Sequence, residues 1–341
     1  MRSTLPWFLS AIALTVLLAR CARQEKPASL PLERYTYHQA MMGTRFQITL
    51  YAQSKTMADE AAMAAFRYAD QVNTACSDYD VTSELMQLND SPANKTIPVS
   101  PLLYDVLAKA RDVAAATNGA YDPTLGHHSY NWRMARRKMQ LPTAGKINQA
   151  KASSGWQKYQ LDPTNQAVTK TISNMRFDLG GIAKGYAADG MLRILMAHHI
   201  SQASITAGGE VRLGDPPPGR DGWEVTLSTL DANHRLSPHT LTLSNCAIST
   251  SGDLHQSITI NGQRYSHIVD PATGLGLTTR RSATVIGETC TQTDALATAL
   301  CVNPGLKPAG FMTLVIFEKP DGHPGVLLSE RSENWPHAAG R

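Results

Sequence analysis

Residues 178–189 read DLGGIAKGYAAD, and no other stretch of the chain says as much about its fold and chemistry. Gly180 and Gly181 carry no Cβ, so the backbone there can approach a ligand closely. The residues that follow predict a helix from about Ile182 to His198. The first amides of a helix favour phosphate, and Lys184 adds a positive charge at that end. The stretch predicts a phosphate-binding turn; a plain strand–turn–helix junction with a solvated lysine is the alternative.

A second motif lies far downstream, where residues 293–300 read TDALATAL within a predicted short helix over 293–302. Asp294 and Thr298 are four positions apart, so they face the same side of that helix. A carboxylate and a hydroxyl are hard oxygen ligands that suit Mg²⁺, which completes its shell with water and substrate phosphate. In the alternative interpretation Asp294 caps the start of the helix and Thr298 packs in the core.

A histidine and a tight turn form the third candidate feature. The Asn261-Gly262 pair predicts a β-hairpin with strands at 257–260 and 263–269. His267 lies on the second of these strands, just before an Asp-Pro-x-Thr-Gly turn that would fix its place. A positioned histidine is the commonest general base, so His267 is a candidate base, although a histidine on a strand is more often structural.

Periodicity elsewhere predicts both helices and strands. The expected elements are a strand around Phe46–Leu50, helices over 58–75 and from Pro101 to about Gly119, a strand over 223–227, and a hairpin with strands at 313–317 and 325–328. We therefore expect an α+β class with mixed or antiparallel sheets and flanking helices, in one domain over 35–330. No G-x-G-x-x-G follows a strand and no P-loop motif occurs, so neither of those nucleotide sites is indicated.

Composition excludes one broad class of function. The chain has 341 residues and a formal net charge of +4, from 32 basic and 28 acidic residues. That balance is too small to indicate nucleic-acid binding. Aromatic residues make up 6% of the chain, which leaves little to stack on bases. We therefore expect no nucleic-acid partner.

The N-terminus has the pattern of an export signal. Arg2 precedes an apolar run over 5–19, so we expect a signal peptide over 1–20. The sequence Leu-Ala-Arg20-Cys21 resembles a bacterial lipobox, although a small residue is typical where Arg20 stands. We expect a lipid anchor at Cys21; a plain cleaved signal and an uncleaved anchor are the alternatives. Each of the three places the rest of the chain outside the cytoplasm, on the periplasmic side of the inner membrane.

The expected domain is flanked by polar segments. Residues 21–34 contain two prolines in a polar context and predict a tether, and 331–341 predict a disordered tail. No C-x-x-C occurs among the cysteines, so a cysteine metal site is not indicated. A disulfide among Cys76, Cys246, Cys290 and Cys301 stays open, because pairing cannot be read from spacing.

Taken in series, eight motifs resemble the ApbE family of FAD:protein FMN transferases. They occur in the family's order between Met42 and about Leu300. The motifs are Met42-Gly43-Thr44, Tyr79 with Ser83-Glu84-Leu85, Asn118-Gly119-Ala120-Tyr121-Asp122-Pro123-Thr124, Asp178–Gly185, Gly208-Gly209, Ser249-Thr250-Ser251-Gly252, His267–Gly274 and Asp294–Leu300. The chain departs from the family after Gly126, where His127-His128 stands in place of Pro-Leu, and at Leu254 and Gly276.

The resemblance implies a role for each matching position. The positions that line the FAD site are Met42, Tyr79, Ala120, Tyr121, Asp122, Asp178, Lys184 and His267. The magnesium site is implied at Asp294, Thr298 and the backbone oxygen of Gly181. The departures after Gly126 concern the substrate-side wall and leave the implied metal ligands in place.

The resemblance also implies the reaction. FMN passes from the substrate FAD to a threonine or serine hydroxyl of another protein, with Mg²⁺ as cofactor, and AMP leaves. We expect His267 or Asp178 as the base, and Lys184 and Asp294 to stabilise the diphosphate. The expected acceptor is an exported domain of a membrane redox complex. Two rival functions stay open: hydrolysis of FAD to FMN and AMP, and a non-catalytic flavin-binding lipoprotein.

Overall fold

The computed structural model describes residues 31–230, 236–252 and 257–329. The chain divides into two units at Leu32, and the larger unit begins at Glu33. The expected signal segment, Cys21, Leu254 and the expected tail lie outside the described residues. Among the helices that are described, none has both the length and the apolar character required to span a membrane.

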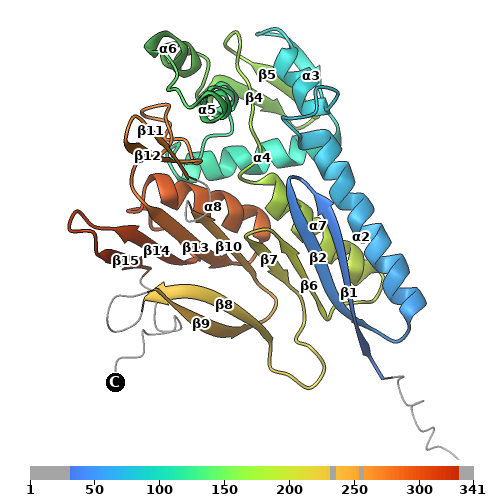
Figure 1. Cartoon of the computed structure of the whole chain (residues 1–341). Coiled ribbons are helices and arrows are strands. Elements are labelled where there is room, and N and C mark those ends of the chain that lie inside the picture. Colours follow the sequence, from blue (N-terminus) through green and yellow to red (C-terminus); the bar gives the residue numbers. More distant parts are fainter. Residues whose placement is uncertain (1–30, 231–235, 253–256, 330–341) are drawn as a thin grey trace, which may run out of the picture. The chain divides into compact units, whose positions relative to one another are not determined.

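Helices and strands alternate along the larger unit (Figure 1). The helices are α2 (Lys55–Cys76), α3 (Glu84–Asp90), α4 (Pro101–Ala116), α5 (Gly126–Lys138), α6 (Ala144–Ala152), the 3₁₀ turn η1 (Trp156–Lys158), α7 (Ala183–Ala197) and α8 (Cys290–Val302). The strands are β1 (Glu33–Met41), β2 (Thr44–Ala52), β3 (Thr96–Pro98), β4 (Tyr159–Asp162), β5 (Ala167–Lys170), β6 (Ala203–Ala207), β7 (Glu210–Leu213), β8 (Trp223–Leu230), β9 (Leu236–Leu243), β10 (Ala247–Gly252), β11 (Ser257–Ile260), β12 (Gln263–Ser266), β13 (Arg281–Gly287), β14 (Met312–Glu318) and β15 (Pro324–Leu328).

Eight strands form the main sheet, in the order β1-β2-β6-β7-β10-β13-β14-β15. Every neighbouring pair in it is antiparallel. The expected strand over Phe46–Leu50 is the second strand of this sheet, and its three apolar side chains are fully buried on one face. The α+β class is therefore confirmed, and the main sheet is antiparallel rather than mixed.

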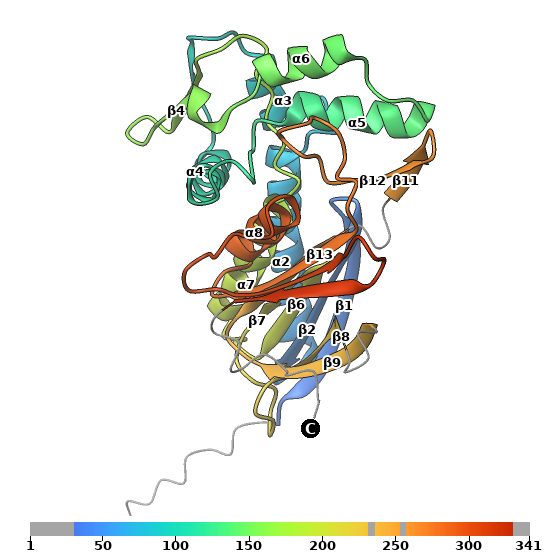
Figure 2. The ribbon, with the colours of Figure 1, turned by 90° about the vertical axis from the view of Figure 1, so that its left-hand side faces the viewer.

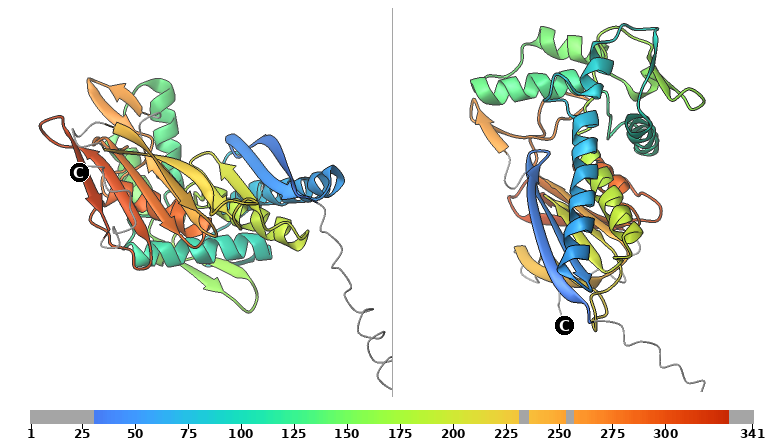
Figure 3. Two further views of the ribbon diagram at one scale, coloured as in Figure 1. Left: turned by 90° about the horizontal axis from the view of Figure 1, so that it is seen from below. Right: turned by 90° about the vertical axis from the view of Figure 1, so that its right-hand side faces the viewer.

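The helices α2, α7 and α8 cover one face of this sheet and enclose the largest core, while the β8–β9 hairpin packs on the other face (Figure 2). Figure 3 shows α2 lying lengthwise beside α7 and the β1–β2 pair. Alanines fill the inner side of α2, including Ala58, Ala61 and Ala65. Small side chains let the helices approach closely, and the contact with α7 requires Gly190, where a Cβ would lie 1.8 Å from the Tyr68 ring.

A smaller layer stands at the end of the sheet where α5 and α6 lie (Figure 1). Trp132 of α5 is buried against the β11–β12 hairpin, and its Nε1 donates a hydrogen bond to the carbonyl of Ser266 at 3.0 Å. The hairpin turn at Asn261-Gly262 has positive φ at both positions, as the sequence predicts. This layer brings the segment around residue 267 toward α5.

Helix boundaries follow the predicted caps with one informative exception. Ser100 accepts the amide of Leu103 and Pro101 opens α4, and the Gly119 amide closes that helix on the Ala114 carbonyl. The helix predicted over 293–302 begins three residues earlier, at Cys290. The earlier start has a tertiary cause, because the side chain that caps this helix belongs to α7.

Candidate active site

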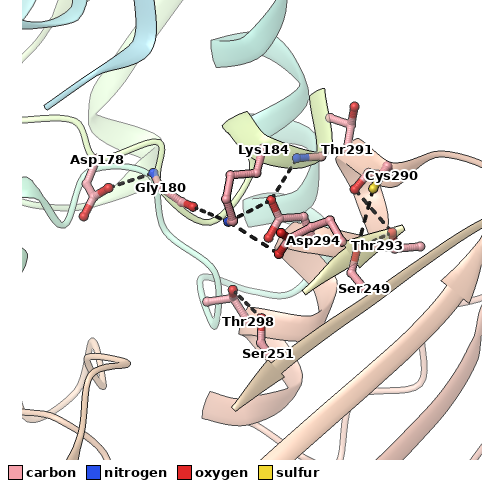
Figure 4. Close-up of polar contacts among 12 residues, drawn as sticks. Asp178, Gly180, Lys184, Ser249, Ser251, Cys290, Thr291, Thr293, Asp294 and Thr298 are labelled. Carbon is pink, nitrogen blue, oxygen red and sulfur yellow. Dashed lines mark hydrogen bonds and ion pairs between the residues drawn. The ribbon is translucent and has the colours of Figure 1, made fainter. Parts of the chain in front are cut away.

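Lys184 lies in the first turn of α7 and is held by three oxygen atoms (Figure 4). Its Nζ is 3.1 Å from the carbonyl of Gly180, 3.4 Å from Oε1 of Glu210 and 3.5 Å from Oδ2 of Asp294. The side chain is 23% exposed. Lys184 is therefore a fixed cation beside two carboxylates, and the alternative of a solvated lysine is wrong.

Charge and burial oppose each other in this cluster. Burial disfavours the charged form of Lys184, but Asp294 and Glu210 together outweigh it and raise the lysine pKa above its ordinary value. Burial, and after it the charge of Asp294, raises the pKa of Glu210. Lys184 therefore carries its positive charge in a mostly buried corner, where charges interact more strongly than they would in water.

Asp294 does not cap its own helix. It is 1% exposed, and its Oδ2 accepts the amide of Gly185 in the first turn of α7 at 3.1 Å. The N-cap position of α7, Ile182, supplies no side-chain hydrogen bond, so the carboxylate of α8 serves instead. The contact requires Gly185, because a Cβ there would lie 2.2 Å from the carbonyl oxygen of Cys290.

Asp189 of α7 in turn caps the first turn of α8. It accepts the amides of Cys290 and Thr291 at 2.9 and 2.8 Å, and the Thr291 hydroxyl at 2.6 Å. Arg212 Nε also donates to it at 2.9 Å. This external cap explains why α8 begins at Cys290, and the alternative in which Asp294 caps the start of α8 is wrong.

Oxygen donors meet on the side of this cluster that faces β10. Thr298 Oγ1 lies 3.3 Å from Ser251 Oγ (Figure 4). A Cβ built on Gly181 would come within 3.3 Å of both Thr298 Oγ1 and the Tyr121 ring. Gly181 thus leaves a space between its own backbone, the Thr298 hydroxyl and the Tyr121 ring, which we call the Gly181 cradle. The hydroxyl of Tyr121 is buried and makes no hydrogen bond within the described residues.

These donors fit Mg²⁺, although they do not form a closed protein cage. Within 31–230, 236–252 and 257–329, no group of three or more His, Cys, Asp or Glu side chains has a metal-holding arrangement. Magnesium usually takes one or two carboxylates and completes its octahedron with water and substrate phosphate. One carboxylate, one hydroxyl and the Gly181 cradle match that pattern. The sequence prediction therefore agrees with the chemistry of the donors that the fold brings together.

The predicted flavin-side residues lie on several elements around the cluster. Asp178 Oδ1 accepts the Gly180 amide at 2.8 Å and so shapes the glycine turn. Asp122 accepts the amide and hydroxyl of Thr124 and the amide of Trp156, and burial raises its pKa. Both carboxylates thus fix backbone turns.

Two more of the predicted flavin-side residues are set in backbone turns. Met42 has φ +49° in the tight β1–β2 turn, next to Gly43 at +72°. Ala120 is part of the turn after α4, where its amide donates to the Thr117 carbonyl at 3.1 Å.

The two remaining predicted flavin-side residues are Tyr79 and His267. Tyr79 is 76% exposed, and the guanidinium of Arg133 lies 4.4 Å from the centre of its ring. His267 was expected on a strand, but β12 ends at Ser266, so it lies half-buried in the following loop. The strand ends early because the backbone after Ser266 pairs across a turn with Leu277 and Gly276.

Sequence reasoning missed Glu210, Asp189 and Arg212. Glu210 directly follows the Gly208-Gly209 pair, which was the only local signal for it. Asp189 ends the quoted stretch, but nothing in that stretch names its partners in α8. Cys76, Cys246, Cys290 and Cys301 form no disulfide, so the pairing left open from sequence does not occur in this structure.

Comparison with known proteins agrees with the fold and the motifs. The family model described as "ApbE family" matches residues 42–312. The chain is 31% identical over 302 residues to the FAD:protein FMN transferase of Vibrio cholerae serotype O1, with 86% of this chain and 87% of the relative covered. It is 30% identical over 256 residues to the FAD:protein FMN transferase of Chlamydia muridarum, covering 74% and 78%.

Solved structures give the same result. The flavin transferase ApbE from Vibrio cholerae superposes with a TM-score of 0.77 at 28% identity and covers 88% of this chain and 98% of that one. The apo flavinyl transferase ApbE of Pseudomonas stutzeri shares the fold with a TM-score of 0.80 at 22% identity, covering 91% and 99%. The match of the family model over most of the chain, together with these relatives, shows that the chain belongs to the ApbE family.

Proposed function

We propose that this chain transfers FMN from FAD to a threonine or serine hydroxyl of another protein and releases AMP. The observation that carries the proposal is the junction of α7 and α8. There a fixed ammonium in the first turn of a helix lies beside the glycine cradle. Such a junction suits a diphosphate, because it offers positive charge and close backbone approach without a large side chain in the way.

The chain's own residues supply binding and charge. The Lys184 ammonium binds the FAD diphosphate and stabilises charge that develops on it, and the Gly180-Gly181 turn lets the diphosphate approach the backbone closely. The acceptor hydroxyl oxygen forms a bond to the FMN phosphorus as the bond from that phosphorus to the AMP oxygen breaks. The hydroxyl proton passes to a base, for which His267 is our candidate and Asp178 the alternative. Correct in-line placement provides much of the acceleration in such transfers.

Magnesium belongs to the same proposal. Asp294, the hydroxyl of Thr298 and the carbonyl of Gly181 would hold it. When bound, the ion neutralises the diphosphate and polarises the phosphorus. A carrier that only stores flavin needs no such ligand set, which favours the enzyme over the flavin-binding lipoprotein.

The location and the acceptor complete the proposal. The basic and apolar start of the chain and Cys21 support export and a lipid anchor on the periplasmic side of the membrane. An enzyme held there meets exported proteins, so an exported domain of a membrane redox complex is the acceptor that we propose. Mass spectrometry of the membrane-bound protein would show whether Cys21 carries a lipid.

A single incubation tests the reaction. The purified protein is mixed with FAD, Mg²⁺ and an exported redox subunit, and the subunit is weighed. We expect a gain of one FMN less water, abolished by EDTA and by Asp294→Ala, and retained by Asp221→Ala, which removes an exposed carboxylate. AMP without any gain in mass would favour hydrolysis. Bound, unchanged FAD would favour the carrier.

A further inference from the structure

A pocket of about 450 Å³ lies between α3, α5 and the strand-like segment before Asp178. One stripe of α5 forms much of its wall, at helical spacing. The residues of that stripe are Gly126, His127, Tyr130, Arg133, Met134 and Arg137. We call this hollow the α5 pocket. It uses the part of the chain where the sequence departs from the family pattern, after Gly126.

The α5 pocket is positively charged. Three arginines line it, Arg133, Arg137 and Arg176, against one lining carboxylate, Asp78. Arg133 is paired with that carboxylate at 2.6 Å. Arg176 pairs at 3.3 Å with Asp90, whose side chain is 66% exposed and does not line the pocket, and it also contacts Met86 Sδ at 3.2 Å.

The remaining groups do not cancel this charge. Burial lowers the pKa of His127, which also contacts the carbonyl of Asn174, so the imidazole is neutral at pH 7. Arg137 is exposed in the last turn of α5. A ligand that brings carboxylates therefore gains charge-assisted hydrogen bonds from Arg137 and Arg176.

Exposed apolar side chains surround these cations. Tyr79 and Val81 are each 76% exposed and Tyr130 is 56% exposed, and all three line the pocket. Large aromatic side chains beside arginines are typical of surfaces that bind another protein chain. A pocket of this composition fits an extended acidic segment better than a flat anionic membrane surface, because its walls enclose the ligand.

The α5 pocket adjoins the proposed reaction site. Phe177 lines it, and the next residue is Asp178 of the glycine turn. Burial and, after it, the charge of Asp178 raise the pKa of Asp78 on the opposite wall. The acceptor hydroxyl must reach the FAD diphosphate beside this glycine turn. The part of the acceptor chain that extends from the hydroxyl toward α5 therefore passes the arginines of the pocket.

We propose that the α5 pocket docks the segment of the acceptor protein next to its modified hydroxyl, and that this segment is acidic. The inference rests on the proposed function and adds the chemistry of the partner. Its test compares Arg137→Glu with Arg136→Glu. Both arginines lie in the last turn of α5, but only Arg137 lines the pocket, so the two variants share the same charge change and the same effect on the helix end.

The experiment uses the full chain in the host that makes it, with each variant replacing the native copy. Proteins that carry covalent flavin fluoresce under ultraviolet light in a denaturing gel, which gives the initial rate of modification. FAD affinity and the melting temperature are measured on the purified variants. We expect Arg137→Glu to slow modification about tenfold or more, with Arg136→Glu within about twofold of wild type. The FAD dissociation constant should stay within about twofold in both.

Other outcomes overturn the proposal in separable ways. Equal rates for the two variants would show that the α5 pocket does not contact the acceptor. Loss of FAD affinity in Arg137→Glu would assign the pocket to FAD instead. Weaker binding of Arg137→Glu to anionic vesicles, with unchanged modification, would assign it to the membrane. If the wild-type chain itself labels no protein, the proposed function fails and the docking role falls with it.

Discussion

Asp189 and Asp294 each cap the first turn of the other's helix. Asp189 of α7 accepts the amides that open α8, and Asp294 of α8 accepts the Gly185 amide in the first turn of α7. Neither helix has a side-chain cap from its own N-cap residue. The exchange locks the two helices in one register, and that register sets the distance between Lys184 and Asp294.

The exchange predicts a stability cost for Asp189→Ala. The change leaves two amides, a hydroxyl and the Nε of Arg212 without their acceptor. We expect the free energy of unfolding to fall by about 2–4 kcal/mol, measured by urea denaturation. Lys55→Ala, which breaks an exposed pair with Asp59, should cost less than about 1 kcal/mol. An Asp189→Ala protein as stable as the Lys55→Ala control would contradict the capping role.

Lys184 and Glu210 should be energetically coupled. Lys184→Met leaves the buried carboxylates of Glu210 and Asp294 side by side, so we expect a loss of about 3 kcal/mol. In a Glu210→Gln background one of those acidic groups is gone, and the same substitution should cost about 1 kcal/mol less. The four proteins of this double-mutant cycle can be compared by denaturant unfolding. Strictly additive costs would mean that the two groups do not interact.

Gly181→Ala should impair transfer without unfolding the protein. The added Cβ would stand 3.3 Å from Thr298 Oγ1 and from the Tyr121 ring, inside the cradle that we assign to the substrate and magnesium. We expect the transfer rate to fall roughly 10- to 100-fold, since small displacements of reacting groups are costly. The melting temperature should stay close to that of Gly145→Ala, a control whose Cβ meets no atom within 4 Å. Unchanged transfer would remove Gly181 from the site.

A buried lysine gives the pH dependence that we expect of stability. Lys170 is 1% exposed, its Nζ donates to the carbonyls of Asn89 and Met175, and burial lowers its pKa to about 8. The unfolded chain, with a lysine pKa of about 10.4, binds more protons between these two values. Stability from this group therefore rises with pH across that window.

The variant Lys170→Met isolates this contribution from other groups that titrate at high pH. Between pH 7 and pH 10, the stability of the wild type relative to Lys170→Met should rise by about 2 kcal/mol. Urea denaturation at both pH values, under reducing conditions, measures the difference. A constant difference would show that the ammonium of Lys170 is not penalised in the folded protein.

Much of the fold follows from local sequence patterns. The alternation in Phe46–Leu50, the alanine-rich α2, the Ser100–Pro101 cap and the Asn261-Gly262 turn each act over a few residues. Their outcome depends on side-chain periodicity and backbone preference, which are present in any window of the chain. The residue types at the site were predictable for the same reason, since glycines, a lysine, a carboxylate and a hydroxyl carry their chemistry with them.

The sequence by itself determined which groups are available; the tertiary structure decided what each one does. In the alternative interpretation Asp294 caps its own helix, but it caps α7 instead. Helix α8 starts early because Asp189, 101 positions away from Cys290 in the chain, accepts the Cys290 amide. The Gly208-Gly209 pair before Glu210 gave no indication of its partner, because its ion pair with Lys184 forms only when the two segments pack together. Hydrogen bonds and charge interactions depend on distance and on exclusion of water, and packing alone sets both for residues so far apart in the sequence.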